Sequence, residues 1–336
     1  MSQLKDKNGD NLMPNTTAYN VSYGNTNVAD AIAALEQGGS GGGGTPSLPL
    51  AGKRICFFGD SITDPFASTG GYPDLVISKV GAIPRTPMNL VTTSIDNIPA
   101  DLFTNKSAIY GISGCNSSTV KKMVMGTLEF TGWEIDRYAK HIKVGYEEEK
   151  DFTQYAAVVI MIGTNATGTM VCDIDADIPD ICVNDIDSYP YAYSATGKTK
   201  PSATLNSPTD FFNLCFGNTY LGDLAASIEY IRWKNPNCRI YLVTIPPNDY
   251  DFESNNPKQF KNVRNMILEL GEKMSVQVID AQAKAGCGLY NIGYWIGNDP
   301  FGSGHKVHPN AIGKELWASY ISNELDKQWY NTNVTT

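Results

Sequence analysis

The stretch AAVVIMIG, residues 156–163, is an almost uninterrupted apolar run. A short run of this kind is typical of a strand that is covered on both faces, as in a parallel sheet. Four other short apolar runs are predicted to be strands of the same sheet. They are KRICFF at 53–58, SAIYGIS at 107–113, RIYLVTIP at 239–246 and VQVIDA at 276–281.

Helix signals alternate with these strands. One apolar stripe runs along residues 220–234, which end before a proline, and consists of Leu221, Leu224, Ile228 and Ile231. Residues 258–274 are similar. A third stripe is predicted along 310–328 and consists of Ile312, Leu316, Tyr320 and Leu325. This alternation predicts an α/β fold in which helices enclose a sheet of five parallel strands.

Length, charge and hydropathy exclude some classes of protein. The chain has 336 residues, a formal net charge of −9 and an isoelectric point of about 4.9, so it lacks the basic surplus of a nucleic-acid-binding protein. No apolar run reaches the roughly 20 residues that a membrane-spanning helix needs. The opening MSQLKDKNGDNLMP has no apolar segment typical of a secretory signal. We therefore expect a protein made in the cytoplasm, without a signal peptide or membrane span.

Seven cysteines are spread from Cys56 to Cys287, and none forms a C-x-x-C motif. They are predicted to be scattered buried or free thiols. The alternative, a local disulfide, concerns only Cys172 and Cys182, which lie close together in the sequence.

A glycine-rich stretch divides the chain into unequal parts. QGGSGGGGTP at 37–46 is typical of a flexible linker, and we place the parts at 1–36, 37–47 and 48–336. The first part is too short to hold a core of its own, but VADAIAALE at 28–36 predicts a short helix with one apolar stripe. Such a helix needs a partner, either a second copy of the chain in a homo-oligomer or another protein.

Small and polar residues follow three of the predicted strands. These groups are Gly59-Asp60-Ser61, Ser113-Gly114 and Gly163-Thr164-Asn165. In open parallel sheets, ligands bind outside the carboxyl ends of the strands, so we expect these groups to lie near one another. Each group taken alone is equally compatible with ordinary turn or helix-capping chemistry.

A late histidine completes the groups that acyl transfer from an ester requires. Ser61 offers a hydroxyl, and His308, on a loop before Pro309, offers a neutral imidazole as its base. The backbone N–H groups of Ser61 and Gly114 and the side-chain amide of Asn165 are candidates for an oxyanion hole. His308 could instead only cap the helix that follows.

Four sequence blocks in order resemble those of the SGNH, or GDSL, hydrolase superfamily over roughly residues 51–330. The blocks are GDSIT at 59–63, SG at 113–114, GTN at 163–165 and VHPN at 307–310. The resemblance implies a flavodoxin-like three-layer α/β/α sandwich. It also implies that Ser61 is the nucleophile, that His308 is the base, and that Gly114 and Asn165 are oxyanion donors. It implies no metal and no organic cofactor.

The fourth block departs from the family pattern. The family usually has an aspartate three residues before the base, and this chain has His305 there. The group that orients His308 is therefore missing, replaced by a backbone carbonyl, or brought from elsewhere, with Asp299 a candidate by its proximity in sequence. Loss of such an aspartate can lower kcat by about 10⁴. A working dyad or rebuilt triad and a weakened site are both compatible with this departure.

A long segment with little helix or strand pattern, residues 166–210, follows the third block. It contains a D-x-D-x-D run at 173–177, but Ile178 and Asn184 stand where a calcium-binding loop needs glycine and glutamate. We therefore expect no metal site. Such an insertion more often shapes access to a site, and its tyrosines at 189, 191 and 193 would suit sugar rings or pack within the loop itself.

The first 36 residues resemble N-terminal segments of bacteriophage tail-fibre and receptor-binding proteins. The resemblance rests on a K-D-x-x-G-x-x-x-x-P run from Lys5 to Pro14 and a V-x-D-A-I run from Val28 to Ile32. It implies a segment that docks the chain to tail proteins of a virion.

Two hypotheses of different classes follow. The first is a serine esterase that acts on an acylated carbohydrate or small ester, removes O-acetyl groups from a surface polysaccharide, and forms part of a phage tail. The second is a catalytically weak or inactive module that keeps the SGNH fold to bind glycans. A lipase or lysophospholipase is disfavoured because no amphipathic membrane-surface helix is evident.

Overall fold

The computed structural model divides into two compact units, residues 1–47 and 48–336. In the first unit the structure describes only β1 (Ser22–Tyr23) and β2 (Thr26–Asn27), which pair antiparallel. In the second it describes residues 48–64, 71–86, 105–129, 146–165, 212, 216, 219–247, 259–288, 291–297 and 307–331. The helix expected at 28–36, the linker at 37–47 and the insertion at 166–210 lie outside the described residues and stay predictions.

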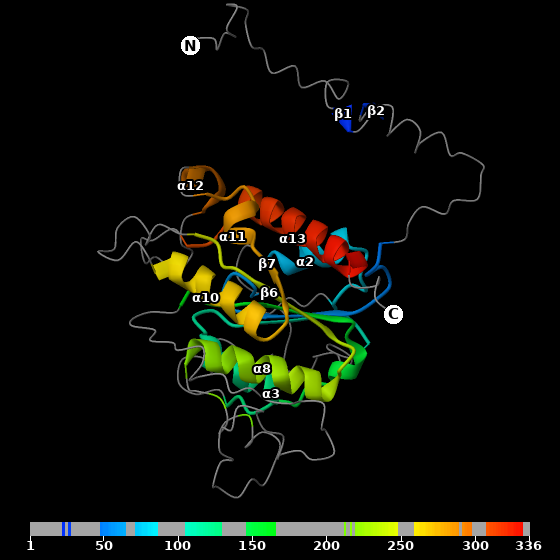
Figure 1. Cartoon of the computed structure of the whole chain (residues 1–336), viewed down its shortest axis with the longest axis vertical. Coiled ribbons are helices and arrows are strands. Elements are labelled where there is room, and N and C mark those ends of the chain that lie inside the picture. The colour runs from blue at the N-terminus through cyan, green and yellow to red at the C-terminus, as the bar shows by residue number, and fades with distance from the viewer. Residues whose placement is uncertain are drawn as a thin grey trace, which may run out of the picture. The chain divides into compact units, whose positions relative to one another are not determined.

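Five parallel strands form one sheet in the second unit, in the order β4-β3-β5-β6-β7 (Figure 1). They are β3 (Ile55–Gly59), β4 (Ala108–Gly111), β5 (Ala157–Met161), β6 (Arg239–Val243) and β7 (Gln277–Ile279). All five predicted strands are confirmed, and each is shorter than the apolar run that predicted it.

The register of the three strands β4, β3 and β5 determines where the polar groups lie. Gly59, the last residue of β3, pairs with Gly111 of β4 and with Met161 of β5. The three strands therefore end level with one another. The segments that follow them, at 60–64, 112–116 and 162–165, leave the sheet at the same edge.

Helices cover both faces of the sheet, which gives three layers (Figure 1). One face carries α3 (Ser117–Met125), α8 (Tyr220–Lys234) and α10 (Gln259–Lys273), and the other carries α2 (Pro73–Lys79) and α13 (Ala311–Asn331). Three short helical segments complete the described elements: η3 (Phe152–Gln154), α11 (Ala281–Lys284) and α12 (Ile292–Trp295). The predicted α/β/α architecture is confirmed.

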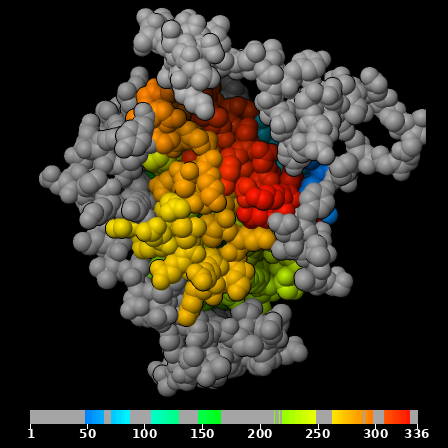
Figure 2. All heavy atoms as spheres, turned by 45° about the horizontal axis from the view of Figure 1, so that its top comes forward, coloured from blue at the N-terminus to red at the C-terminus, as the bar shows by residue number. Residues whose placement is uncertain are grey.

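Figure 2 shows the surface beside β7. The chain from β7 to α12, coloured orange, lies between α10 in yellow and α13 in red. α13 contacts α11, α12 and β7, and α10 contacts β7. The outermost strand on this side of the sheet is therefore covered by helices from both layers.

Helix α8 begins and ends at the residues that the sequence predicted. Thr219 caps its first turn, because the Thr219 Oγ1 accepts a hydrogen bond of 3.1 Å from Gly222 N. Pro236 disfavours helical geometry at the residue before it, so the helix stops at Lys234. The predicted apolar stripe of this helix is buried throughout.

The apolar face predicted for α13 is confirmed at Leu325, which is fully buried, and is wrong at Ile312 and Leu316. Ile312 and Leu316 are 42% and 36% exposed, whereas Trp317 and Ile321 are fully buried. The Trp317 indole lies in the core and donates from Nε1 to the Met161 Sδ at 3.4 Å. Because burying a tryptophan removes a large apolar area from water, Trp317 favours this rotation of α13.

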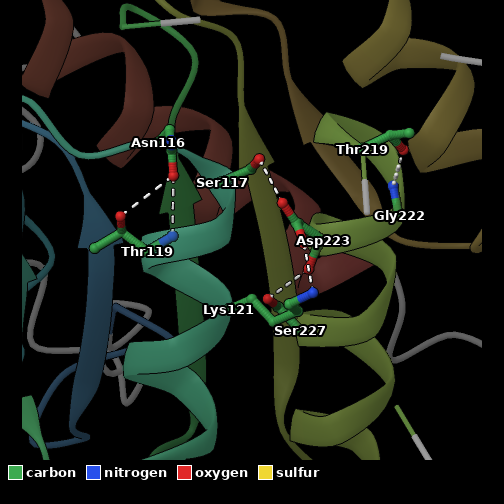
Figure 3. A network of polar contacts seen from close by, with 8 residues as sticks. All are labelled: Asn116, Ser117, Thr119, Lys121, Thr219, Gly222, Asp223 and Ser227. Atoms are coloured by element: carbon green, nitrogen blue, oxygen red, sulfur yellow. Dashed lines mark hydrogen bonds and ion pairs between the residues drawn. The ribbon is translucent and has the colours of Figure 1, made fainter. Parts of the chain in front are cut away.

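A buried polar network joins α3 to α8 (Figure 3). The Lys121 Nζ lies 2.6 Å from the Asp223 Oδ1, and both side chains are less than a tenth exposed. Ser117 Oγ donates to the Asp223 Oδ2 at 2.9 Å, and Ser227 Oγ donates to the Asp223 carbonyl at 2.8 Å. One carboxylate therefore compensates the buried ammonium and holds the two helices together.

Asp223→Ala should lower the free energy of unfolding by about 3–5 kcal/mol, because it leaves the Lys121 charge buried without its counter-ion. Urea unfolding of the full chain measures the effect. Lys327→Ala is the matched control, since the Lys327 side chain is 67% exposed in its ion pair with Glu324 and should change the stability by at most about 1 kcal/mol. Equal effects of the two substitutions would contradict the importance given to the buried pair.

Four cysteines among the described residues are buried and form no disulfide: Cys56, Cys115, Cys238 and Cys287. Burial raises the pKa of the Cys287 thiol to about 11 and that of Cys238 to about 12. The prediction of scattered buried or free thiols is confirmed for these four, while Cys172 and Cys182 lie outside the described residues. Within the described part of the chain, no helix combines the length and apolar character needed to cross a bilayer.

Candidate active site

Ser61 lies in a tight turn that follows β3 directly. The Asp60 carbonyl accepts hydrogen bonds from Thr63 N at 3.0 Å and Asp64 N at 2.9 Å. A Cβ at Gly59 would lie 2.2 Å from the Thr63 Oγ1 and 2.4 Å from the Met161 carbonyl oxygen. Only glycine fits at the end of the strand, and this lets the chain turn at once and present the next residues at the sheet edge.

The structure brings Ser61 and His308 into hydrogen-bonding contact. The His308 Nε2 lies 2.7 Å from the Ser61 Oγ, although 247 residues separate them. Ser61 is 6% exposed, and His308 is partly buried. At this distance a neutral imidazole can take the hydroxyl proton as the oxygen attacks an ester.

Backbone contacts on both sides hold His308 in place. Its carbonyl accepts a hydrogen bond from Gly297 N at 2.8 Å, and Asn310 N donates to the Trp295 carbonyl at 2.9 Å. Trp295 is fully buried at the end of α12. The general-base candidate is thus anchored to the core through a short antiparallel bridge rather than carried on a free loop.

The alternative in which His308 only caps the last helix is wrong. Gly313 N donates to the Asn310 Oδ1 at 3.0 Å, so Asn310 supplies the side-chain cap at the start of α13. The Asn310 Nδ2 also donates to the Tyr294 carbonyl at 2.9 Å. The imidazole of His308 is left to contact Ser61.

Two of the three predicted oxyanion donors, Gly114 and Asn165, lie in loops that contact each other. Gly114 has a φ of 80°, a left-handed conformation that favours glycine. The Asn165 Nδ2 donates to the Cys115 carbonyl at 3.0 Å. Because a carbonyl can only accept, this bond fixes which end of the Asn165 amide faces the Gly114–Cys115 loop, and the same nitrogen carries a second hydrogen for a substrate oxygen.

The candidates for orienting His308 lie outside the described residues. Asp299 and His305 both fall in the segment 298–306, which lies outside the described residues. Their roles remain predictions. The acidic run at 173–177 also lies outside, and the described residues contain no cluster of side chains suited to hold a metal ion.

Asp60 is a fully buried carboxyl beside the candidate nucleophile. Its Oδ1 accepts a hydrogen bond of 3.0 Å from Ile62 N. Burial raises the pKa of Asp60 to about 6, and contacts with Ile62 and Thr164 offset only part of that rise. Ionisation of Asp60 in the folded chain therefore lowers the stability of the fold.

The raised pKa of Asp60 predicts a pH-dependent effect of Asp60→Asn. In the wild type, stability should fall as pH rises from about 4 to about 6, because the folded state holds this proton more tightly than the unfolded state. The difference between the pKa of Asp60 in the folded chain and the ordinary pKa of an aspartate corresponds to about 3 kcal/mol in the free energy of unfolding. An asparagine oxygen can still accept a hydrogen bond from Ile62 N. The free energy of unfolding of the variant should therefore rise relative to that of the wild type across this pH range, and the difference should stay constant at higher pH.

Urea unfolding of both proteins at about pH 4.5, about pH 6 and about pH 7.5 measures the difference in their free energies of unfolding. A difference in unfolding free energy that stays the same at all three pH values would show that Asp60 does not titrate with a raised pKa.

The sequence assigned no contact to three buried residues at the site, although one of them, Ser113, belongs to the second block. Ser113 Oγ donates to the Asp64 Oδ2 at 2.9 Å, and Cys115 Sγ donates to the Gly59 carbonyl at 3.1 Å. Ser113 belongs to the second block, and Asp64 and Cys115 directly follow the first and second blocks. Their position beside Ser61 and Gly114 was the only available signal, and it does not reveal which partner each side chain meets.

Comparison with solved structures finds remote likenesses. A lipase/acylhydrolase from Enterococcus faecalis has 16% identity and a TM-score of 0.40, with 82% of this chain and 96% of that chain covered. A carbohydrate esterase family 3 protein from Talaromyces cellulolyticus has 14% identity, a TM-score of 0.42 and coverages of 83% and 99%. An acetyl esterase crystallised with an acetate ion has 15% identity, a TM-score of 0.44 and the same coverages. No curated protein sequence matched the chain.

A family model gives the decisive comparison. The model of the GDSL-like lipase/acylhydrolase family matches residues 57–316, a range that contains Ser61, Gly114, Asn165 and His308. The match covers most of the chain and begins in β3, immediately before the turn that bears Ser61. The chain therefore belongs to the GDSL-like lipase/acylhydrolase family and is a serine esterase of the SGNH type.

Proposed function

We propose that this esterase removes short acyl groups, and acetyl groups in particular, from the hydroxyls of a surface polysaccharide. The observation that supports catalysis most directly is the 2.7 Å contact between the Ser61 Oγ and the His308 Nε2. Serine and histidine with neutral oxyanion donors complete ester hydrolysis with water as the only co-reactant.

In the proposed reaction, the Ser61 Oγ attacks the acyl carbonyl carbon while the His308 Nε2 takes the hydroxyl proton. The carbonyl oxygen becomes an oxyanion, which accepts hydrogen bonds from the N–H groups of Ser61 and Gly114 and from the Asn165 amide. The intermediate then collapses and its bond to the sugar oxygen breaks, and that oxygen takes the proton from His308 and leaves as a hydroxyl. Water repeats the sequence on the acyl-enzyme, releasing the carboxylic acid and restoring Ser61.

An exposed aromatic side chain supports a carbohydrate as the alcohol part of the ester. Tyr294 is 64% exposed. Its carbonyl accepts a hydrogen bond from the Nδ2 of Asn310, which follows His308 by two residues in the sequence. The neighbouring Trp295 is buried and donates from its indole Nε1 to the Gly288 carbonyl at 3.0 Å, so α12 presents Tyr294 from a fixed base. A rigid aromatic ring with a polar tip suits the apolar face and hydroxyls of a sugar.

A second candidate, a lipase acting on long acyl chains, is favoured by one observation. Ile312 and Leu316 are 42% and 36% exposed on α13, the helix that follows His308 in the sequence. An apolar surface beside a catalytic base could also receive an acyl tail. Acyl-chain preference therefore distinguishes the two functions.

The test compares kcat/KM for p-nitrophenyl acetate, butyrate and octanoate, and acetate release from acetylated xylan, with Ser61→Ala as the control. The proposal expects the acetate ester to be the best of the three and the polymer to be deacetylated only by the wild type. Preference for octanoate, increased by micelles, would support the lipase instead. No turnover by the wild type between about pH 6 and 9 would support the inactive glycan-binding module.

Residues 1–36 are proposed to dock the enzyme to a tail assembly or to a second copy of the chain. Residues 48–336 form a separate compact unit, which supports removing the N-terminal part without disturbing the enzyme. Sedimentation of the full chain and of a chain starting at Leu48 tests self-association. The same oligomeric state for both would exclude an oligomerising role.

A further inference from the structure

We propose that Asp64 and Ser113 are positioning residues that fix the Gly114 N–H relative to the Ser61 Oγ. This inference rests on the proposed function, because it assumes that Gly114 donates to the oxyanion. Neither residue belongs to the pair that exchanges a proton with the substrate.

The two side chains make a buried hydrogen bond between the first and second blocks. Ser113 Oγ donates to the Asp64 Oδ2 at 2.9 Å, with Asp64 1% and Ser113 4% exposed. Asp64 N in turn donates to the Asp60 carbonyl at 2.9 Å, so Asp64 is part of the turn that carries Ser61. The bond therefore links the nucleophile turn to the residue that immediately precedes Gly114.

Backbone packing makes this link stiff. A Cβ at Gly111 would lie 2.4 Å from Asp64 N and 2.5 Å from the Asp64 Cα, so the end of β4 touches the nucleophile turn backbone to backbone. Ile112 N donates to the Gly59 carbonyl at 3.2 Å, and Cys115 Sγ donates to the same oxygen at 3.1 Å. With the loop held at 112 and 115, the Ser113 side chain adds a further contact to the residues between them.

The position of Ser113 matters because of the peptide bond that follows it. The Ser113 carbonyl carbon and the Gly114 N–H belong to one planar unit, so any rotation about the Ser113 backbone turns that N–H. Gly114, with φ at 80°, resists such rotation less than a residue with a side chain would. Releasing the Ser113 hydroxyl should therefore misalign the donor, and donors to an oxyanion act only when they are aimed at the developing charge.

The fold offers a matched control for the loss of a buried serine–aspartate bond. Ser117 Oγ donates to the Asp223 Oδ2 at 2.9 Å, and Ser117 is 6% exposed. Ser117→Ala removes the same chemistry between α3 and α8, where no oxyanion donor is held. A merely structural role for Ser113 predicts that Ser113→Ala and Ser117→Ala behave alike.

The experiment measures kcat and KM for p-nitrophenyl acetate, and inhibition by a methyl trifluoromethyl ketone, in the full chain. Ser113→Ala should lower kcat about 10–100-fold with KM changed less than about threefold, and weaken the ketone by a similar factor, because the ketone forms an oxyanion on Ser61. Asp64→Asn should act in the same direction. The kcat of the double variant should be no lower than that of the less active single variant. Ser113→Thr keeps the hydroxyl and should recover most of the wild-type kcat.

A loss of stability in Ser113→Ala with kcat and ketone binding unchanged, as expected for Ser117→Ala, would overturn the positioning role. So would additive effects of the Asp64 and Ser113 substitutions. These outcomes are distinct from failure of the proposed function, which would appear as a wild type without turnover or as a Ser61→Ala variant with wild-type turnover.

Discussion

Ser61→Ala is expected to lower kcat for p-nitrophenyl acetate by about 10⁴–10⁶-fold, while changing the free energy of unfolding by less than about 1 kcal/mol. The substitution removes the oxygen that forms the acyl-enzyme, so both half-reactions are lost. The hydroxyl contributes one hydrogen bond, to the His308 Nε2, and its removal creates no sizeable cavity. Residual turnover would come from the remaining oxyanion donors.

The same reasoning predicts that Ser61 and His308 act as a unit. His308→Gln should reduce kcat by a comparable factor, because the hydroxyl then lacks a base at 2.7 Å. The double variant should be about as active as either single variant, since the second removal takes away nothing that still operates. Single-turnover rates of the two single variants and of the double variant measure these effects. Multiplying losses in the double variant would show that the two residues serve separate steps.

Asn165→Ala is expected to lower kcat by about 10²–10³-fold with little change in KM, as for other single oxyanion donors. The side chain donates to the Cys115 carbonyl, so the variant should also lose a little stability. Asn165→Asp is the sharper comparison, because its carboxylate offers no donor and repels a developing oxyanion. It should be less active than Asn165→Ala. An aspartate variant as active as the wild type would remove Asn165 from the oxyanion hole.

Apolar runs were sufficient to predict the sheet and the three long helices. Helices α2 and α3 were missed for different reasons. α2 has seven residues, too few for a periodic pattern. α3 buries Ser117 and Lys121, whose polar side chains hide the inward face until their partner Asp223, on α8, is known.

The position of the site followed from the sequence because parallel strands that end level bring their following residues together. Ser61 and His308 meet as the order of the blocks implied. The Asp64–Ser113 bond could not be predicted, since it depends on the register of β3 against β4 rather than on a motif. Asp299 and His305 stay predictions as groups that orient His308, because they lie outside the described residues.

The central claim, that Ser61 is a nucleophile activated by His308, is tested most directly by covalent trapping. An alkyl fluorophosphonate reacts with an activated serine, losing fluoride as the Oγ–P bond forms. Intact-mass and peptide mapping should find one adduct per chain, on Ser61, formed much more slowly in His308→Gln and absent in Ser61→Ala. Labelling of another residue with loss of esterase activity, or full activity of the wild type after Ser61 is labelled, would contradict the account.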